Sequence, residues 1–387
     1  MPVWLAVVSL IAGESIIPCY AGSPFPRSCS AYSHLADEDS ARFGVLPSGA
    51  VTNLIMLPTG SFNSRTGYLQ VRYTSDAPPS APSRFVLKCN TPEAYSIAAG
   101  ADEVRFYRLI AEFKDHPQVI PPCFAAEYDS SSGDSFLLLQ DLSETHAPPI
   151  TRLEQISIVN GVPLDIQQES VIDLLAVLHA YWWDHPRLVR GEFDVGYWSH
   201  DPERFNLYLA KRMAAWERLS AKDGRRIPAE IRRFYALLFE RLPDYFTETL
   251  APRFSALRNL TLTHGDSYFC NFLCPKVSGS APTYLMDWQS PSVDLAAYDL
   301  VNLLAAFWTR AQRREKEREL SLLRRYHQDL LSHGVQGFTW ENLLADYRSG
   351  LIFWVLMPIQ DGGDGSAWTY WWPKMQCLVA AFEDWGC

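Results

Sequence analysis

The pattern of the chain changes near residue 141, and this change restricts the fold more than any other feature of the sequence. Before it, short runs rich in β-branched and aromatic residues are separated by Gly, Ser, Pro and Asn, which is typical of strands joined by turns. A helix with apolar residues at helical spacing is expected from about Pro92. The expected strands are 51–57, 68–73, 84–89, 123–128 and 136–139.

After residue 141 the apolar positions follow the period of a helix, most strongly in residues 169–183. Strands that precede a run of helices indicate an α+β protein. We expect residues 48–143 to form a five-stranded antiparallel lobe with one helix, and residues 144–387 a mainly helical lobe. Further helices are expected at 201–219, 228–245, 295–309, 313–333, 340–356 and 373–385. The charged segment 310–325 is expected to be a solvent-exposed helix face.

Composition narrows the choice of partners. The net charge of −10 argues against a nucleic-acid-binding surface; it could favour cationic substrates, or serve solubility alone. No apolar run approaches the roughly 20 residues that span a bilayer, so no membrane partner is expected. The eight cysteines are scattered without a dense framework, which indicates a reducing compartment and a cytoplasmic protein.

Residues 1–47 are expected to form a peripheral N-terminal segment. The apolar run 4–12 is short, and no Lys or Arg precedes Arg27, so the positive start of a secretory signal is missing. A targeting segment is the alternative.

The strongest chemical signal is the run Thr-His-Gly-Asp-Ser-Tyr-Phe-Cys-Asn at 263–271. It contains Asp266 and, five residues later, Asn271; a second acid, Asp287, follows an apolar strand. Transfer of phosphate from Mg-ATP needs a carboxylate beside the attacking hydroxyl and oxygen ligands for the metal. We therefore predict Asp266 as the catalytic base and Asn271 and Asp287 as magnesium ligands. Taken singly, each of them could instead be a turn cap.

Other residues of this loop have simpler expected roles. His264 is expected to orient the loop through backbone hydrogen bonds rather than to carry protons. Cys270 and Cys274 lie near it, but three soft ligands without a second cysteine pair do not predict a zinc site.

Lys88 stands alone in an apolar strand and needs a partner, because an unpaired buried charge is expensive. Glu103 on the next helix is the natural one, and such a pair would place the lysine on the phosphates of ATP. The alternative is a lysine on an edge strand that faces solvent. The turn containing Gly60 and Ser61 would cover the phosphates, although it is not a G-x-G-x-x-G run.

Five separated segments stand in one order: Phe85–Lys88, Glu103–Tyr107, Leu137–Leu142, Leu178–Ala180, and the His264–Asn271 loop with Asp287-Trp288. With them, residues 48–387 resemble the aminoglycoside phosphotransferase/choline kinase family of small-molecule kinases, close to its ecdysteroid-kinase-like branch. The resemblance implies a two-lobed, protein-kinase-like fold, the use of ATP and Mg²⁺, and a small-molecule hydroxyl as acceptor.

The resemblance also assigns further residues. It implies that Leu139, Gln140, Asp141 and Leu142 form the hinge against the adenine, largely through backbone groups. It implies that Asp299 braces the catalytic loop by hydrogen bonding. Gln140 stands where family members often have Glu.

Two alternatives follow from the same residues. A catalytically silent nucleotide-binding or scaffold protein would keep the fold without the reaction. A protein kinase would need an activation segment after Asp287, and about seven residues before the helix near Leu295 leave no room for one. The acceptor itself stays undetermined by the sequence. Six tryptophans of the helical lobe could enclose a cationic or apolar ligand, but packing between helices is expected for most: Trp182, Trp183, Trp308, Trp354, Trp371 and Trp372.

Overall fold

The computed structural model describes residues 51–59, 64–158, 161–196 and 201–387, which form two compact units. The first unit contains the described residues up to His116 and Ile120–Thr145; the second contains Pro117–Val119 and the rest of the chain from His146. Each unit is described by itself. The N-terminal segment 1–47, Gly60 and Ser61 lie outside the described residues.

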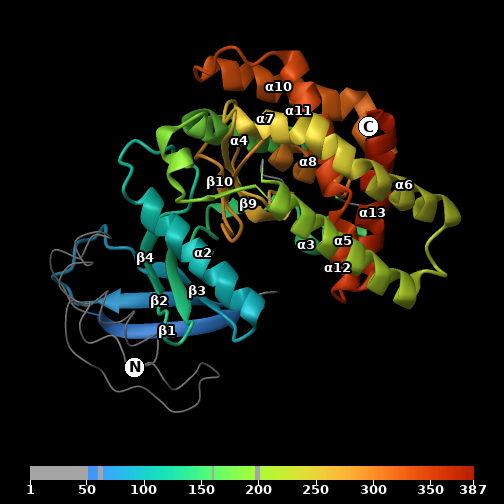
Figure 1. Cartoon of the computed structure of the whole chain (residues 1–387). Helices are drawn as coiled ribbons and strands as arrows, with labels where there is room; N and C mark the ends of the chain where they lie inside the picture. The colour runs from blue at the N-terminus through green and yellow to red at the C-terminus, as the bar shows by residue number, and fades with distance from the viewer. Residues whose placement is uncertain (1–50, 60–63, 159–160, 197–200) are drawn as a thin grey trace. The chain divides into compact units, whose positions relative to one another are not determined.

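The first unit is a five-stranded antiparallel sheet with the order β1-β2-β3-β5-β4, as predicted. Figure 1 shows the helix α2, which the described residues of this unit form, beside β3 and β4. Its elements are β1 (Val51–Thr59), β2 (Ser64–Tyr73), β3 (Arg84–Asn90), α2 (Ala94–Ile110), β4 (Cys123–Tyr128) and β5 (Ser135–Gln140).

Alternation along β3 explains why one lysine can stand in this strand. Phe85, Leu87 and Cys89 are buried in the apolar core on one face of the sheet. Because successive side chains of a strand point to opposite faces, Lys88 points away from that core. It therefore faces the side from which Glu103 of α2 reaches it.

The second unit is mainly helical and contains two small three-stranded sheets, β10-β9-β6 and β7-β11-β8. Its strands are β6 (His146–Ala147), β7 (Asp194–Val195), β8 (Thr261–Thr263), β9 (Phe272–Pro275), β10 (Tyr284–Leu285) and β11 (Ser292–Asp294). Its α-helices are α3 (Arg152–Ser157), α4 (Asp165–Trp182), α5 (Pro202–Asp223), α6 (Ala229–Tyr245), α7 (Ala251–Ser255), α8 (Ala297–Ala305), α9 (Arg310–Arg314), α10 (Arg318–Ser332), α11 (Trp340–Trp354), α12 (Met357–Gly363) and α13 (Trp368–Asp384).

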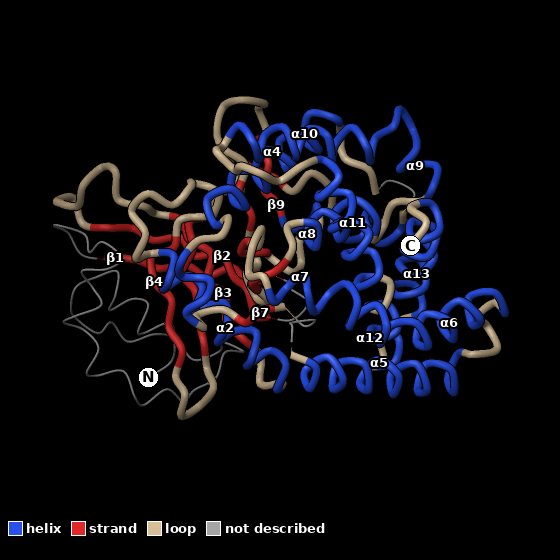
Figure 2. The backbone as a smooth tube through the Cα atoms, turned by 45° about the horizontal axis from the view of Figure 1, so that its top comes forward, coloured by secondary structure: helices blue, strands red, loops and turns tan. Residues whose placement is uncertain are grey.

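Helices of this unit pack in pairs: α4 against α10, α8 against α11, and α12 against α5 (Figure 2). Four of the six tryptophans fill the spaces between elements, as expected. Trp182, Trp308, Trp354 and Trp371 are each at most 1% exposed, so none of them forms an open ligand surface. Within the described residues, no helix combines the length and apolarity needed to cross a bilayer.

The predicted helix 313–333 is wrong, because the chain turns sharply at Lys316 and Glu317, where φ is +52° and +53°. The turn separates α9 from α10. Its physical reason is Arg313, which was expected on an exposed face but is 1% exposed and donates hydrogen bonds to Glu319 and Asp384. A straight helix would not satisfy this buried guanidinium in the same way.

Further helix boundaries also differ from the prediction, two of them beside a proline. The predicted helix 340–356 ends at Trp354, and α12 begins at Met357 with Pro358 in its first turn, where the missing N–H is tolerated. The final helix begins at Trp368 rather than at Pro373, which lies inside it. The residues that add this extra turn include Trp371, which is fully buried. Its burial offsets the backbone hydrogen bond that a proline inside a helix loses. Predicted helix 295–309 is shorter, since α8 ends at Ala305.

Candidate active site

The loop after β8 is shaped by a glycine that no other residue could replace without strain. β8 pairs with β11 in an antiparallel register that sets Thr263 opposite Ser292, and the Thr263 hydroxyl donates to the Ser292 carbonyl at 3.0 Å. The chain then passes through Gly265 with φ +79°. A Cβ at this position would lie 2.4 Å from the carbonyl oxygen of Ser290. The glycine therefore lets the loop turn directly against the segment that follows Asp287.

Asp299 of α8 holds this loop, and the structure confirms the predicted bracing. Its fully buried carboxylate accepts hydrogen bonds from the backbone N–H groups of His264 at 2.7 Å and Gly265 at 2.9 Å. Nε2 of His179 lies 3.2 Å from the same carboxylate. Burial by itself would raise the pKa of Asp299, but the contacts with His179 and His264 hold it below its usual value. The Asp299 carboxylate therefore stays anionic while it accepts hydrogen bonds from the two backbone N–H groups.

His264 connects the loop to the segment that carries the second acid. Its Nδ1 accepts from the backbone N–H of Asp266 at 3.2 Å, so the ring proton resides on Nε2, which donates to the Met286 carbonyl at 3.0 Å. The ring is fully buried and packs edge-on against Trp288. These contacts confirm the expected orienting role, because one ring nitrogen holds the backbone of Asp266 and the other holds the backbone before Asp287.

Asp266, Asn271 and Asp287 come together in the second unit. The side-chain amide nitrogen of Asn271 donates to the Asp266 carbonyl at 2.8 Å and lies 3.3 Å from the Asp266 carboxylate. Burial, followed by the negative charge of Asp287, raises the pKa of Asp266 to about 7, against the opposing influence of Lys374 and Arg152. Asp287 adopts φ +72°, a conformation that disfavours most side chains. Two half-buried acids that influence each other are typical of a functional site.

Two basic residues near Asp266 were missed by the sequence reasoning. Arg152 begins α3, and Lys374 lies on α13, where it is 2% exposed and forms an ion pair of 3.0 Å with Asp361. Burial alone would lower the pKa of Lys374, but Asp361, Tyr370 and Asp266 hold it above its ordinary value. A signal was present in the sequence, because Lys374 is the only Lys or Arg of α13 and directly follows a segment rich in tryptophan.

The first unit contains the predicted pair of Lys88 and Glu103. The Lys88 ammonium lies 2.6 Å from one carboxylate oxygen of Glu103 and 2.8 Å from the other. The Glu103 side chain is 3% exposed and that of Lys88 is 14% exposed. The solvent-facing alternative for the lysine is therefore wrong, and its ammonium is held at a fixed position.

The predicted hinge residues form the end of β5 and the turn after it, in the same unit. Leu139 and Leu142 are buried, and the Asp141 carboxylate accepts from the Arg84 guanidinium at 2.9 Å and from the Ser143 backbone N–H at 2.9 Å. Gln140 donates its backbone N–H to Pro122 and pairs with Phe85. The Asp141 side chain is therefore committed to the turn that ends the strand.

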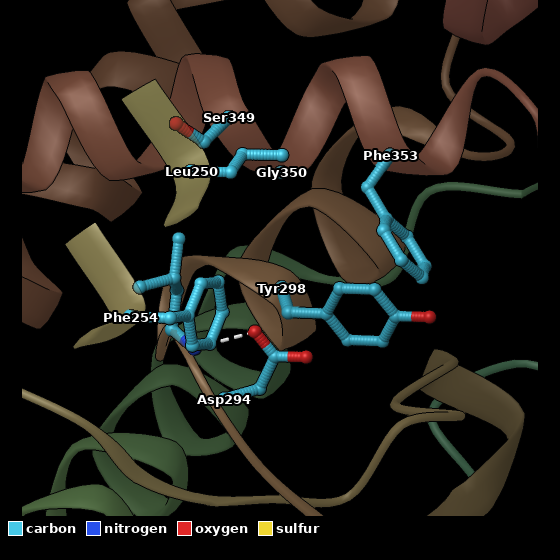
Figure 3. A pocket seen from close by; sticks show the side chains of 8 residues that line it. Leu250, Phe254, Asp294, Tyr298, Ser349, Gly350 and Phe353 are labelled. Carbon is cyan, nitrogen blue, oxygen red and sulfur yellow. Dashed lines mark hydrogen bonds between the residues drawn. The ribbon is translucent and has the colours of Figure 1, made fainter. Parts of the chain in front are cut away.

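A small pocket in the second unit includes none of these predicted residues. It is lined by Leu250, Phe254, Asp294, Leu295, Tyr298, Ser349, Gly350 and Phe353. Figure 3 shows the Asp294 carboxyl between the rings of Phe254 and Tyr298. Burial raises the pKa of Asp294 to about 7. The space is at the limit for a single water molecule, so this pocket is not a substrate site.

Comparison with known proteins identifies the family. A model of the ecdysteroid kinase-like family matches residues 104–335. The chain belongs to this family. The predicted resemblance is thereby confirmed, and so is the predicted class of enzyme, a small-molecule kinase. No curated protein matches the sequence.

Several solved structures are similar to this ecdysteroid kinase-like protein. An ethanolamine kinase from Plasmodium vivax is 12% identical, with 86% of this chain and 83% of that chain covered and a TM-score of 0.51. A GDP complex of an aminoglycoside 2'-phosphotransferase-IIIa mutant is 13% identical, with coverages of 87% and 92% and a TM-score of 0.49. A microcompartment-associated aminopropanol kinase is 12% identical, with coverages of 89% and 93% and a TM-score of 0.49. The likeness to the ethanolamine kinase, at a TM-score of 0.51, concerns the fold alone, and the predicted protein-kinase-like fold class is confirmed.

Proposed function

We propose that this ecdysteroid kinase-like protein transfers the γ-phosphoryl group of ATP, with Mg²⁺, to a hydroxyl group of a small molecule. The observation that carries the proposal is the fixed position of Asp266. The loop before it is bound to the buried Asp299 carboxylate, and Asn271 binds it from the other side. A carboxylate fixed in this way can act as a base, because its orientation is already set before the acceptor hydroxyl reacts.

Asp266 would accept the proton of the acceptor hydroxyl. The hydroxyl oxygen forms a bond to the γ-phosphorus, the bond from that phosphorus to the bridging oxygen breaks, and ADP leaves with the electron pair. Burial of Asp266 favours this role, since a carboxylate with a raised pKa is a better proton acceptor than an exposed one.

Asn271 and Asp287 are suited to hold the metal. The amide nitrogen of Asn271 is bound to Asp266, so its oxygen is turned away from the base. An amide oxygen and a carboxylate form the hard oxygen set that Mg²⁺ prefers. The mutual repulsion of Asp266 and Asp287 also favours a cation between or beside them. When bound, Mg²⁺ would neutralise charge on the phosphate oxygens.

The first unit would supply the nucleotide contacts. Lys88, held by Glu103, would contact the phosphates, and Gly60 and Ser61 would cover them. Leu139, Gln140, Asp141 and Leu142 would contact the adenine. Because the Asp141 carboxylate is bound to Arg84 and Ser143, its contribution would come from the backbone.

A screen for ATP-dependent gain of one phosphate by hydroxyl compounds tests the proposal. The full chain is compared with Asp266→Asn, which should lose transfer by at least about 10³-fold while it still binds Mg-ATP. Glu317→Gln serves as the control, since it removes one negative charge at an exposed position. A hit phosphorylated at equal rates by the Asp266→Asn variant and the unmodified chain would refute the assignment of the base.

A further inference from the structure

An aromatic cage in the second unit is already filled by a cation of the chain itself. The Lys374 ammonium lies 5.6 Å from the centre of the Tyr268 ring, 5.4 Å from that of Trp354 and 5.5 Å from that of Tyr370. These distances fall within the range of cation–π attraction, and Asp361 adds a carboxylate at 3.0 Å. Three rings and one carboxylate form the surroundings that proteins use to bind substituted ammonium ligands.

The cage borders the candidate base. Tyr268 is two residues after Asp266 in the same loop, and its backbone N–H donates to the Asp266 carbonyl at 2.8 Å. Arg152 adds a second cation near this place, with its guanidinium 6.0 Å from the Tyr370 ring. An acceptor whose hydroxyl reaches Asp266 must therefore lie close to two positive charges of the protein.

A purely structural role does not account for this arrangement. Removing an ammonium from water is expensive, and a neutral, well-packed side chain in place of a buried ion pair often leaves a protein equally stable. Lys374 nevertheless occupies the one charged position on the aromatic part of α13. A functional role of the Lys374 charge would account for the free energy that the burial of its ammonium group costs.

We propose that Lys374 determines the charge class of the acceptor. Its ammonium occupies the cage in which a cationic alcohol would place its own ammonium group, so the site takes alcohols with neutral or anionic groups beside the reacting hydroxyl. The inference rests on the proposed function of Asp266, since it places the acceptor at that carboxylate. Lys374 is a specificity-determining residue in this account and takes no part in the chemical step.

Tetramethylammonium is the probe for the cage, titrated into the full chain without nucleotide and followed by calorimetry. The unmodified chain should show no saturable binding, because its cage is full. Lys374→Ala vacates the cage beside Asp361 and should bind the probe saturably, at least about tenfold more tightly than the weakest binding that the titration of the unmodified chain would detect. Lys374→Arg keeps a cation and should behave as the unmodified chain. Adding Tyr370→Leu to Lys374→Ala should remove the gain.

The outcomes decide the inference. Equal binding of tetramethylammonium by the unmodified chain and by Lys374→Ala overturns it, as does a gain that survives the loss of the Tyr370 ring. If Lys374→Ala does not fold, the similarly short Lys374→Ser replaces it; a folded Lys374→Ser that gains no binding also overturns the inference. The titration contains no ATP, so its result does not depend on the kinase reaction. If Lys374→Ala binds the probe but the unmodified chain phosphorylates no acceptor, only the proposed kinase reaction is refuted. An active kinase without that gain refutes the cage alone.

Discussion

Replacing Gly265 by alanine tests how the candidate loop is built. The glycine has φ +79°, and a side chain in this left-handed region costs roughly 1–2 kcal/mol. The new Cβ would also lie 2.4 Å from the Ser290 carbonyl oxygen and 3.3 Å from the Ser290 Cβ. Such crowding typically costs a further 1–3 kcal/mol. We expect Gly265→Ala to lower the free energy of unfolding by about 2–5 kcal/mol.

The same chain provides a matched control. Gly279 has φ +75° and belongs to the same unit, but a Cβ there would meet nothing within 4 Å. Gly279→Ala should therefore lose only the roughly 1–2 kcal/mol of the backbone conformation. The difference between the two variants in free energy of unfolding therefore measures the effect of the contact with Ser290.

Urea unfolding, followed by tryptophan fluorescence, measures the free energy of unfolding of both variants. The unfolding transition of the second unit is compared between each variant and the unmodified chain. The phosphotransfer assay adds a functional measurement. Moving the loop shifts Asp266, and a displacement of about 1 Å can lower turnover by roughly 100-fold. Gly279→Ala should keep its turnover. If the two alanine variants lose equal stability, the close approach of Gly265 to Ser290 does not shape the loop, and our reasoning fails.

Two predictions concern the nucleotide and the metal. Lys88→Met leaves the buried Glu103 carboxylate without its ammonium, and ATP affinity should fall at least about tenfold in a nucleotide titration. Arg105→Met, which breaks only an exposed pair with Asp102, should not change it, and an equal loss in both variants would contradict the role of Lys88. Asp287→Ala should weaken nucleotide binding when Mg²⁺ is present and leave binding in EDTA unchanged. A magnesium titration that does not respond to Asp287→Ala would count against the metal-ligand assignment.

Local patterns predicted much of the architecture. The five strands and α2 agree with the expected ranges to within a few residues, because alternation and turn residues are local properties. The pairing of Lys88 with Glu103 was also predictable, since a lone charge in an apolar strand requires a partner nearby. The roles of His264 and Asp299 in holding the loop agree with the hydrogen bonds observed.

The errors arose where distant segments override local preference. Arg313 looked like part of an exposed helix, but Glu319 and Asp384 draw it into the interior, and the chain breaks after it. Pro373 looked like the first residue of a helix, yet the buried Trp371 before it extends α13 by a turn. The pairing of Arg313 with Asp384 cannot be read from the local sequence, since Asp384 lies far along the chain.

The sequence by itself determined the order of elements, the family and the identity of Asp266, Asn271 and Asp287 as candidates, because these depend on residue type and short spacings. Only the tertiary structure decided what surrounds Asp266. Lys374 comes from the last helix and Arg152 from the first short helix of the unit, and both meet the loop only after folding. Electrostatic interactions depend on distance in space and on burial rather than on separation along the chain. For that reason the charge at the acceptor side, and with it the proposed acceptor class, emerged only from the folded structure.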